Sequence, residues 1–356
     1  MNDKTDKLFE RIASFADAAL IFSETNRFYF TGFAASDVAL LVYKKGALFF
    51  TDSRYTEAAC RKLGETFVRD SKTLFADLRA LFDAEGIRTV ALENDRLTLA
   101  EYETVKKELP AVQTDISDRL CEAVTALRMV KSPEEIEKTV AAQRIAERAF
   151  DHILPFIRPG VTEKEIALEL EYFMLRNGAD GLSFETIAVS GVNSSLPHGV
   201  PGDKKIESGD FITMDYGALK DGYHSDMTRT VALGHVSEKQ KQIYQTVLAA
   251  QQASLAFLKD GVSGFDADKQ ARDVIEKAGF GAYFGHGTGH GTGVEIHEQP
   301  RLSPQSKRTL HTGNIVTVEP GIYLPGEFGV RIEDMALITE EGCVNLTACP
   351  KELIIL

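Results

Sequence analysis

Short apolar runs alternate with longer amphipathic stretches along the first third of the chain, and each kind predicts a different element. Runs of four to six mostly apolar residues are typical of buried strands, and they lie at Ala18–Phe22, Val38–Tyr43, Ala47–Thr51 and Thr89–Leu92. Apolar residues at helical spacing predict helices at Leu74–Ala84 and Leu99–Leu109, and Pro110 ends the second. This alternation favours an α/β fold.

A strong helix start separates this region from the rest of the chain. Ser132, Pro133 and Glu135 combine an N-cap serine, a proline at the first helical position and the glutamate of a capping box. The helix is expected to run to about Leu154. With 356 residues and about 150 residues per domain, we expect an N-terminal accessory α/β domain at residues 1–125 and a larger α/β domain at residues 126–356.

Two segments of the C-terminal part occur twice in the same order. Gly160-Val161-Thr162 opens a predicted helix that ends near Gly178, and Gly261-Val262-Ser263 opens another, 101 residues later, that ends near Gly279. The segment 209–217 (GDFITMDYG) matches 313–321 (GNIVTVEPG), 104 residues later. Two copies of a helix-then-sheet unit are too few for a solenoid. The repeat therefore predicts a pseudo-twofold α/β domain.

Each copy carries a pair of acidic residues around a turn signal. Asp215 and Asp226 flank Asp221-Gly222, a strong hairpin signal between apolar runs. Glu319 and Glu333 flank Pro325-Gly326 in the second copy. Folding at each turn brings the two acids of a pair together, and the pseudo-twofold directs all four carboxylates at one centre.

Four clustered carboxylates cannot all stay ionised without strong repulsion. Cations relieve it, and two divalent ions bring four positive charges against four negative ones. A single acidic residue is more often an exposed one at a strand edge, but apolar Met214, Val318 and Ile332 flank these acids. The sequence therefore favours a buried site with metal ions.

Charge and composition narrow the class of protein. Acidic residues outnumber basic ones by 53 to 40, for a net charge of −13, which disfavours nucleic acid and anionic membranes as partners. No apolar run is long enough to span a bilayer, and the N-terminus does not read as a signal peptide. Four cysteines without CxxC spacing indicate a reducing compartment. We expect a cytoplasmic protein that binds neither nucleic acid nor membrane.

The histidines gather in the same part of the chain. The segment 285–293 (GHGTGHGTG) fits neither GxGxxG nor the P-loop pattern. Its glycines allow close backbone approach, with His290 available as a neutral nitrogen ligand. His297 follows seven residues later, and His198 precedes Asp215. The other histidines receive a surface or structural role; they are His152, His224, His235, His286 and His311.

In these contexts the residues resemble a known family. Asp215, Asp226, His290, Glu319 and Glu333, within MDYGA, SDMTRT, GTGHGTG, VEPGIY and VRIED, are similar to the five metal ligands of the proline-directed "pita-bread" metallopeptidases. These are the Xaa-Pro dipeptidases (prolidases) and aminopeptidase P. The segments NRFYFTGF (26–33) and TDSRY (51–55) resemble the accessory domain of that family.

The resemblance implies a two-metal peptidase with a pita-bread catalytic domain. The ions are expected to be Mn²⁺, with Co²⁺, Fe²⁺ or Zn²⁺ as alternatives, since carboxylates and one imidazole form a hard site. The family resemblance implies that Asp215 binds one ion, that His290 and Glu319 bind the other, and that Asp226 and Glu333 bridge the two. It further implies Glu319 as general base, His198 and His297 as groups that contact substrate and transition state, and Arg301 as a partner of the substrate carboxylate. The substrates are proline-containing peptides or dipeptides, and a homodimer is expected.

Alternatives remain open at this point. A methionine aminopeptidase shares the five ligands, but the accessory domain of about 120 residues argues against it. A creatinase-type hydrolase uses the fold without metals, and a non-catalytic binding protein built on it usually lacks ligands; the intact ligand set disfavours both. The sequence does not separate dipeptidase from aminopeptidase P, or identify the residue preferred before proline.

Overall fold

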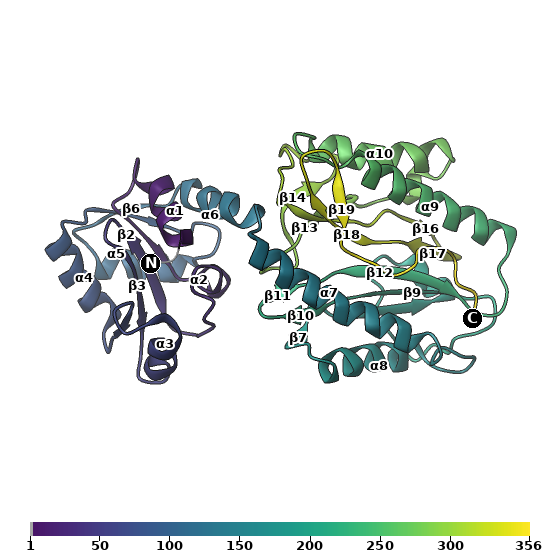
Figure 1. The fold of residues 1–356 in the computed structure, drawn as a ribbon, viewed down its shortest axis with the longest axis horizontal. Coiled ribbons are helices and arrows are strands. Elements are labelled where there is room, and N and C mark those ends of the chain that lie inside the picture. The colour runs from purple at the N-terminus through teal and green to yellow at the C-terminus, as the bar shows by residue number, and fades with distance from the viewer. Residues whose placement is uncertain (1–2) are drawn as a thin grey trace. The chain divides into compact units, whose positions relative to one another are not determined.

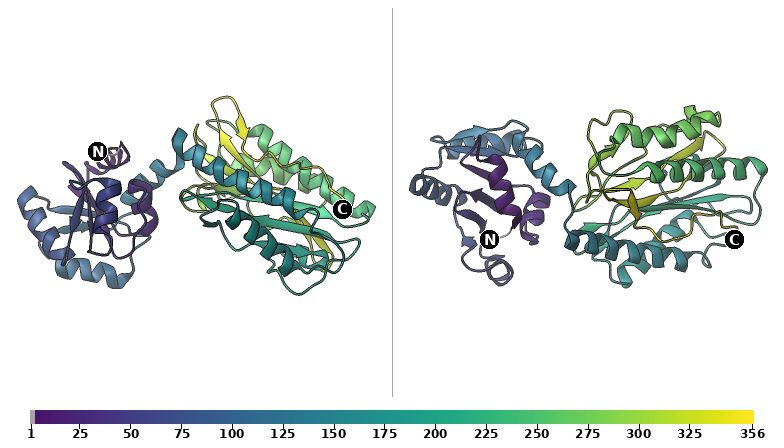
Figure 2. Two further views of the ribbon diagram at one scale, coloured as in Figure 1. Left: turned by 60° about the horizontal axis from the view of Figure 1, so that its bottom comes forward. Right: turned by 45° about the horizontal axis from the view of Figure 1, so that its top comes forward.

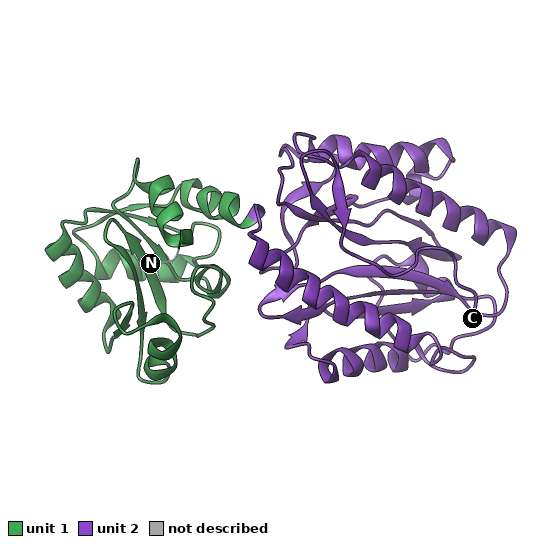
Figure 3. Ribbon diagram, viewed as in Figure 1, with its two compact units in different colours: residues 1–128 green, residues 129–356 purple. Residues whose placement is uncertain are grey.

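The computed structural model describes residues 3–356 and divides the chain into two compact units, the first ending at Arg128 and the second formed by Met129–Leu356 (Figure 3). In the first unit, a six-stranded sheet has the order β4-β3-β2-β1-β5-β6. β1 pairs antiparallel with β2 and parallel with β5, so the sheet is mixed. The strands are β1 (Ala18–Ile21), β2 (Ala39–Tyr43), β3 (Gly46–Thr51), β4 (Val68–Asp70), β5 (Thr89–Leu92) and β6 (Gln113–Asp115).

The helices of this unit bury apolar side chains against the sheet. Leu78 and Phe82 of α4 pack with Leu20 and Leu41 of the central strands, and all four are at most 1% exposed. The predicted strands and both predicted helices of this region are confirmed. The helices are α1 (Asp3–Ile12), α2 (Glu24–Thr31), α3 (Thr56–Leu63), α4 (Leu74–Glu85), α5 (Leu99–Glu108) and α6 (Arg119–Met129).

The second unit has two pairs of helices on either side of a group of short sheets (Figures 1 and 2). One pair is α7 (Pro133–Ile153) and α8 (Glu163–Arg176), and the other is α9 (Glu238–Phe257) and α10 (Gly264–Lys277). The strands of the first half are β7 (Gly181–Leu182), β8 (Ile187–Ser190), β9 (Phe211–Tyr216), β10 (Ala218–Lys220), β11 (Tyr223–His224) and β12 (Met227–Ala232). Those of the second half are β13 (Gly289–Gly291), β14 (Glu298–Leu302), β15 (Ile315–Val318), β16 (Gly321–Leu324), β17 (Phe328–Arg331), β18 (Asp334–Ile338) and β19 (Cys343–Asn345).

Equivalent backbone contacts recur in the two halves. Thr162, the N-cap of α8, forms an antiparallel bridge with Lys205, and Ser263, the N-cap of α10, forms the same bridge with Thr309. The partners are offset by 101 and 104 residues, as in the sequence repeat. The sheets follow the orders β12-β9-β8 and β14-β13-β15-β18-β19. The predicted repeat is therefore present as two similar helix-and-sheet halves.

Helices α7 and α8 both start with reciprocal caps, and the cap at Ser132 was predicted. The Ser132 side chain accepts a hydrogen bond from the Glu135 backbone, and the Glu135 side chain accepts one from the backbone of Ser132. Thr162 and Glu165 form the same reciprocal pair at α8. Each box satisfies two backbone donors that a helix start otherwise leaves free. The start of each helix is thus fixed locally by its own sequence.

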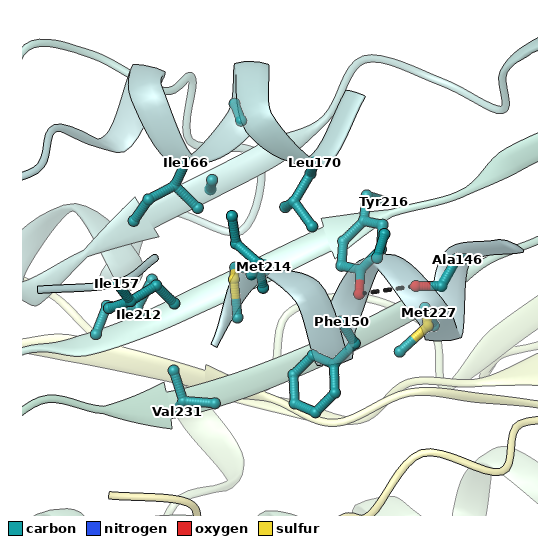
Figure 4. Close-up of a cluster of buried hydrophobic side chains, with 14 of the residues drawn as sticks. Ala146, Phe150, Ile157, Ile166, Leu170, Ile212, Met214, Tyr216, Met227 and Val231 are labelled. Carbon is teal, nitrogen blue, oxygen red and sulfur yellow. Dashed lines mark hydrogen bonds between the residues drawn. The ribbon is translucent and has the colours of Figure 1, made fainter. Parts of the chain in front are cut away.

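A buried core joins α7 and α8 to β9 and β12 (Figure 4). Met214 and Ile212 of β9 face Leu170 of α8, and all three are fully buried. Tyr216 donates a hydrogen bond from its hydroxyl to the carbonyl oxygen of Ala146, at 3.3 Å. This core supports β9, the strand that carries Asp215. Within residues 3–356, no helix is long and apolar enough to cross a membrane.

Candidate metal centre

The first pair of acids lies on one face of a hairpin. β10 and β11 join through Asp221 and Gly222, which have φ of 49° and 78°, the two positive values that a tight type I′ turn requires. The pairing places Asp215 opposite Thr228, two residues past Asp226. Side chains two residues apart share a face of a strand, so the aspartates are close without being directly opposite. The predicted hairpin is confirmed.

The second pair lies between two paired segments. Val318 pairs with Asp334 and Gly321 pairs with Arg331, so Glu319 and Glu333 both stand in the short gap between these pairings. The chain turns at residues 325–327, between the paired Leu324 and Phe328. This is the turn predicted at Pro325-Gly326.

Hydrogen bonds between the two halves bring the pairs together. The Glu333 amide donates to the Thr228 carbonyl at 3.1 Å, and the Thr228 hydroxyl donates to Glu333 Oε2 at 2.7 Å. His290 Nε2 lies 3.3 Å from Glu319 Oε1 and 3.5 Å from Asp226 Oδ2. Asp226, His290 and Glu333 each offer a ligand atom within 4.8 Å of the other two. The structure therefore brings the predicted ligands into one cluster.

A glycine makes this approach possible at β13. A Cβ on Gly289 would lie 1.9 Å from the carbonyl oxygen of Thr317 on β15, so only glycine fits there. The neighbouring His290 amide donates to the Thr317 hydroxyl at 3.1 Å, and that hydroxyl donates to Glu319 Oε1 at 3.2 Å. The expected role of the glycine-rich segment in close backbone packing is thus observed.

Burial and like charge set the electrostatics of the cluster. Burial, with the nearby Asp215 and Glu319, raises the pKa of Asp226 well above its usual range. Burial, with Asp226 nearby, does the same to the pKa of Glu333. Burial raises the pKa of Glu319 to about 8 and lowers the pKa of His290 to about 3. Without cations the carboxyls are pushed toward their neutral forms, and His290 is a neutral imidazole, the form that binds metals.

Two carboxylate oxygens in the cluster are buried without compensation. Asp215 Oδ1 and Glu333 Oε1 have no hydrogen-bond partner among the described residues. A buried polar atom left unpaired costs about 1–3 kcal/mol. Oxygen-rich sites with one imidazole suit Mn²⁺ and similar divalent ions. The residues therefore fit the implied metal ions, which would satisfy both oxygens.

The cluster lies on the wall of a cavity of about 930 Å³, formed within the second unit. His198, His297 and Arg301, the other predicted site residues, line the same cavity. The His297 ring packs edge-on against His290, with ring centroids 4.5 Å apart, and Arg301 on β14 pairs with His290 across the strands. His198 and His297 are exposed to the cavity, as groups that meet a substrate must be.

Arg331 is a site residue that the sequence reasoning did not assign. Its buried guanidinium donates to Asp215 Oδ2 at 2.6 Å, to the Tyr323 hydroxyl at 2.8 Å and to the Thr228 hydroxyl at 3.0 Å. Although burial alone would lower it, the pKa of Arg331 is raised by Tyr323 and Asp215. Residues two apart in a strand share a face, so Arg331 lies on the same face as Glu333. This spacing is the sequence feature from which Arg331 could have been predicted as a site residue.

His286 also lines the cavity, beyond the surface or structural role given to it. Its Nδ1 and Nε2 atoms contact the Gly287 carbonyl at 2.8 Å and the Tyr323 hydroxyl at 3.0 Å. Burial lowers the pKa of His286 to about 4, so the ring is neutral near pH 7. Since Nδ1 donates to a carbonyl, Nε2 accepts from Tyr323. Only the fold reveals this contact, because 37 residues separate His286 from Tyr323.

Comparison with known proteins extends the likeness to the whole chain. Residues 137–340 match metallopeptidase family M24, and residues 6–130 match the creatinase/prolidase N-terminal domain. An Xaa-Pro dipeptidase of Pyrococcus horikoshii is 37% identical over 99% of this chain and 99% of its own. A solved Xaa-Pro dipeptidase from Bacillus anthracis superposes with a TM-score of 0.95 at 42% identity, covering 99% of both chains.

A solved X-Pro aminopeptidase from Thermotoga maritima superposes with a TM-score of 0.92 at 38% identity, over 99% of this chain and 100% of its own. The resemblance drawn from the ligand motifs and the predicted fold class are both confirmed, with a creatinase-like unit followed by a pita-bread domain. The chain belongs to metallopeptidase family M24.

Proposed function

We propose that this protein is a two-metal peptidase that hydrolyses Xaa-Pro bonds in dipeptides or at the N-terminus of peptides. One observation carries the proposal: four carboxylates and His290 converge on a cavity wall, and two buried carboxylate oxygens there lack any partner among the described residues. The similar Xaa-Pro dipeptidases and X-Pro aminopeptidase support the choice of substrate.

Five residues would hold the implied metal ions, namely Asp215, Asp226, His290, Glu319 and Glu333. We favour Mn²⁺, with Co²⁺, Fe²⁺ or Zn²⁺ as alternatives, because oxygen donors dominate. When bound, such ions make water a nucleophile near neutral pH and polarise the scissile carbonyl. Asp215 enters this set already oriented, since Arg331 holds its Oδ2 at 2.6 Å.

Glu319 is proposed as the general base. Its carboxylate takes a proton from the attacking water and delivers it to the proline nitrogen as the C–N bond breaks. Thr317 donates a hydrogen bond to Glu319 Oε1 at 3.2 Å and so fixes the orientation of the carboxylate. A positioned base of this kind contributes about a hundredfold to ten-thousandfold in rate.

His198, His297 and Arg301 are proposed to bind the substrate. The two imidazoles line the cavity and can donate hydrogen bonds to the carbonyl oxygen as it gains negative charge, each worth on the order of 3 kcal/mol. The half-buried Arg301 guanidinium offers a charge partner for the carboxylate of a dipeptide. An Xaa-Pro bond is a tertiary amide without an N–H, and the ring shape is what such a pocket selects.

We also propose a cellular compartment and an oligomeric state. All four cysteines are unpaired thiols, which supports a reducing compartment such as the cytoplasm. A homodimer remains a prediction based on the family resemblance, and sedimentation of the purified protein tests it.

A substrate panel with the Mn²⁺-loaded protein tests the activity. Ala-Pro and Met-Pro should be cleaved, while Ala-Ala should not. Cleavage of Arg-Pro-Pro as well would favour an aminopeptidase P, and confinement to dipeptides would favour a prolidase. Rapid cleavage of Met-Ala-Ser with no turnover of Ala-Pro would replace the proposal by a methionine aminopeptidase. Metal analysis should give about two ions per chain, and activity without any metal would point to a creatinase-type hydrolase.

A further inference from the structure

His297 is held by a segment whose internal anchor is a buried glutamate. The chain leaves β13 at Gly291 and enters β14 at Glu298, so residues 292–297 form a loop beside the metal centre. His297 is the last residue of the loop and its side chain is exposed. The ring packs on His290 at a centroid distance of 4.5 Å. The position of this imidazole therefore depends on the backbone of the loop.

The Glu298 carboxylate lies inside this loop. Its Oε1 accepts a hydrogen bond from the Glu295 amide at 3.0 Å. A Cβ on Gly293 would lie 2.8 Å from the same Oε1, so the carboxylate fills the space next to that glycine. Glu298 is also the residue paired with Gly291 across the strands. Glu298 thus pairs with the first strand through its backbone and holds the middle of the loop through its side chain.

A buried ion pair fixes the carboxylate itself. Lys131 Nζ lies 3.4 Å from Glu298 Oε2, and the two side chains are 1% and 4% exposed. The Lys131 backbone is held by a hydrogen bond from its amide to the Gly313 carbonyl at 2.9 Å. Burying an ion pair costs desolvation energy, so the pair adds little net stability. Removing one partner leaves a buried charge unpaired, so the two side chains are held in one geometry.

We propose that Glu298, together with Lys131, is a positioning residue that holds the 292–297 loop so that His297 faces the reacting carbonyl. The inference rests on the proposed function, because it requires a role for His297 in turnover. Glu298 itself does not touch the substrate in this proposal. Its effect on the rate passes through the backbone of the loop.

The test is a double-mutant cycle between Glu298→Ala and His297→Ala, read as kcat and KM for Ala-Pro. Glu298→Ala should lower kcat about tenfold to hundredfold with KM within about twofold, because a small misplacement of a catalytic group has that effect. In the His297→Ala background the same change should have almost no further effect. Full additivity of the two losses, or an unchanged kcat, would overturn the proposal.

Two further variants separate positioning from general damage to the fold. Glu298→Gln keeps the size and the acceptor toward Glu295, and should lose less rate than Glu298→Ala. Glu147→Gln is the matched control, since Glu147 is a buried glutamate that pairs with Arg144 and accepts from the Ala348 amide at 2.6 Å, away from the loop. It should leave kcat unchanged, and both Glu298 variants should retain bound metal.

Hydrogen exchange provides a readout that does not need activity. Amides of residues 292–297 should exchange faster in Glu298→Ala than in the wild type, and the Glu147→Gln control should show no such change. If the wild type fails to cleave any Xaa-Pro substrate, the proposed function fails while this exchange result still shows whether Glu298 anchors the loop. Unchanged exchange would remove the anchor and with it the proposal.

Discussion

The Thr228 hydroxyl forms hydrogen bonds with two buried charged side chains, Glu333 and Arg331. It donates to Glu333 Oε2 at 2.7 Å and accepts from Arg331 Nε at 3.0 Å. Thr228→Val keeps the shape and leaves both groups with one partner fewer. We expect a loss of about 1–3 kcal/mol in the free energy of unfolding and metal affinity weaker by about tenfold to hundredfold.

Chemical denaturation and metal titration of Thr228→Val measure the two effects. Thr213→Val is the control, because Thr213 is a buried threonine of the same sheet whose hydroxyl contacts Thr230 at 3.0 Å. This control should lose stability but keep its metal affinity. Equal metal affinity in both variants would show that the Thr228 hydroxyl does not orient Glu333.

Glu319→Gln tests whether Glu319 takes part in the chemistry. The amide keeps the shape of the carboxylate but cannot take a proton, so we expect turnover of Ala-Pro to fall by about a hundredfold or more with the fold intact. Steady-state kinetics and circular dichroism of the same preparation check both points. Near-normal activity would remove Glu319 from the role of base.

At the residue scale, the sequence predicted the acidic residues of the site but not the residues that contact them. The acids were predicted because each pair flanks a turn signal, and the structure places them in one cluster with His290. Arg331 and His286 were not predicted as parts of the site, because their partners Asp215 and Tyr323 are distant in the chain. The spacing of Arg331 from Glu333 places both on one face of a strand, but the partner Asp215 is identified only by the fold.

Glycines of the 285–293 segment have unequal roles in forming β13. A Cβ on Gly289 would meet the Thr317 carbonyl at 1.9 Å, whereas one on Gly285 would meet nothing within 4 Å. Gly289→Ala should therefore force β13 away from β15, at a cost of about 1–3 kcal/mol, and should displace His290. Gly285→Ala should change the free energy of unfolding by less than about 0.5 kcal/mol. Thermal unfolding and metal content of the two variants test this difference. Similar unfolding midpoints and metal contents would show that β13 and β15 do not approach each other so closely in solution.

Elements with strong local signals were predicted well. The helix of Pro133–Ile153 was expected from Ser132 and its capping box, and it begins and ends within one residue of the prediction. The helix of Glu238–Phe257 was not recognised, although Ser237 and Gln240 form the same kind of box. Its apolar side is interrupted by glutamines such as the buried Gln251, and that weakens the periodicity by which a helix is recognised.

At the scale of the whole molecule, the repeat predicted more than the strand pattern did. Two motifs repeated in the same order, at offsets of 101 and 104 residues, indicated two similar halves, and the bridges at Thr162 and Ser263 confirm the equivalence. The strand order β4-β3-β2-β1-β5-β6 of the first unit was not predicted. Period-two and apolar runs indicate that a strand exists, but the partner of each strand depends on contacts that are distant in sequence.

The metal-free protein should lose stability as pH rises, and metal should remove that dependence. In the metal-free cluster the pKa of Glu319 is about 8, above its ordinary 4.5, and burial and like charge also raise those of Asp226 and Glu333. The folded chain then binds more protons than the unfolded chain, so the free energy of unfolding decreases as pH rises through about 8. Bound cations keep the carboxylates ionised in the folded state, and this contribution disappears.

Thermal unfolding of chelator-treated protein at about pH 6 and about pH 8.5 should therefore give a higher midpoint at the lower pH. The Mn²⁺-loaded protein should unfold at a higher temperature at both pH values, with the larger gain at the higher pH, because there the metal replaces repulsion between ionised carboxylates. An Asp226→Asn variant has one carboxylate fewer, so its metal-free form should show a smaller pH dependence. A midpoint of the metal-free wild type that rises with pH would show that Asp226, Glu319 and Glu333 do not repel one another in a buried cluster, and the metal centre would have to be reassigned.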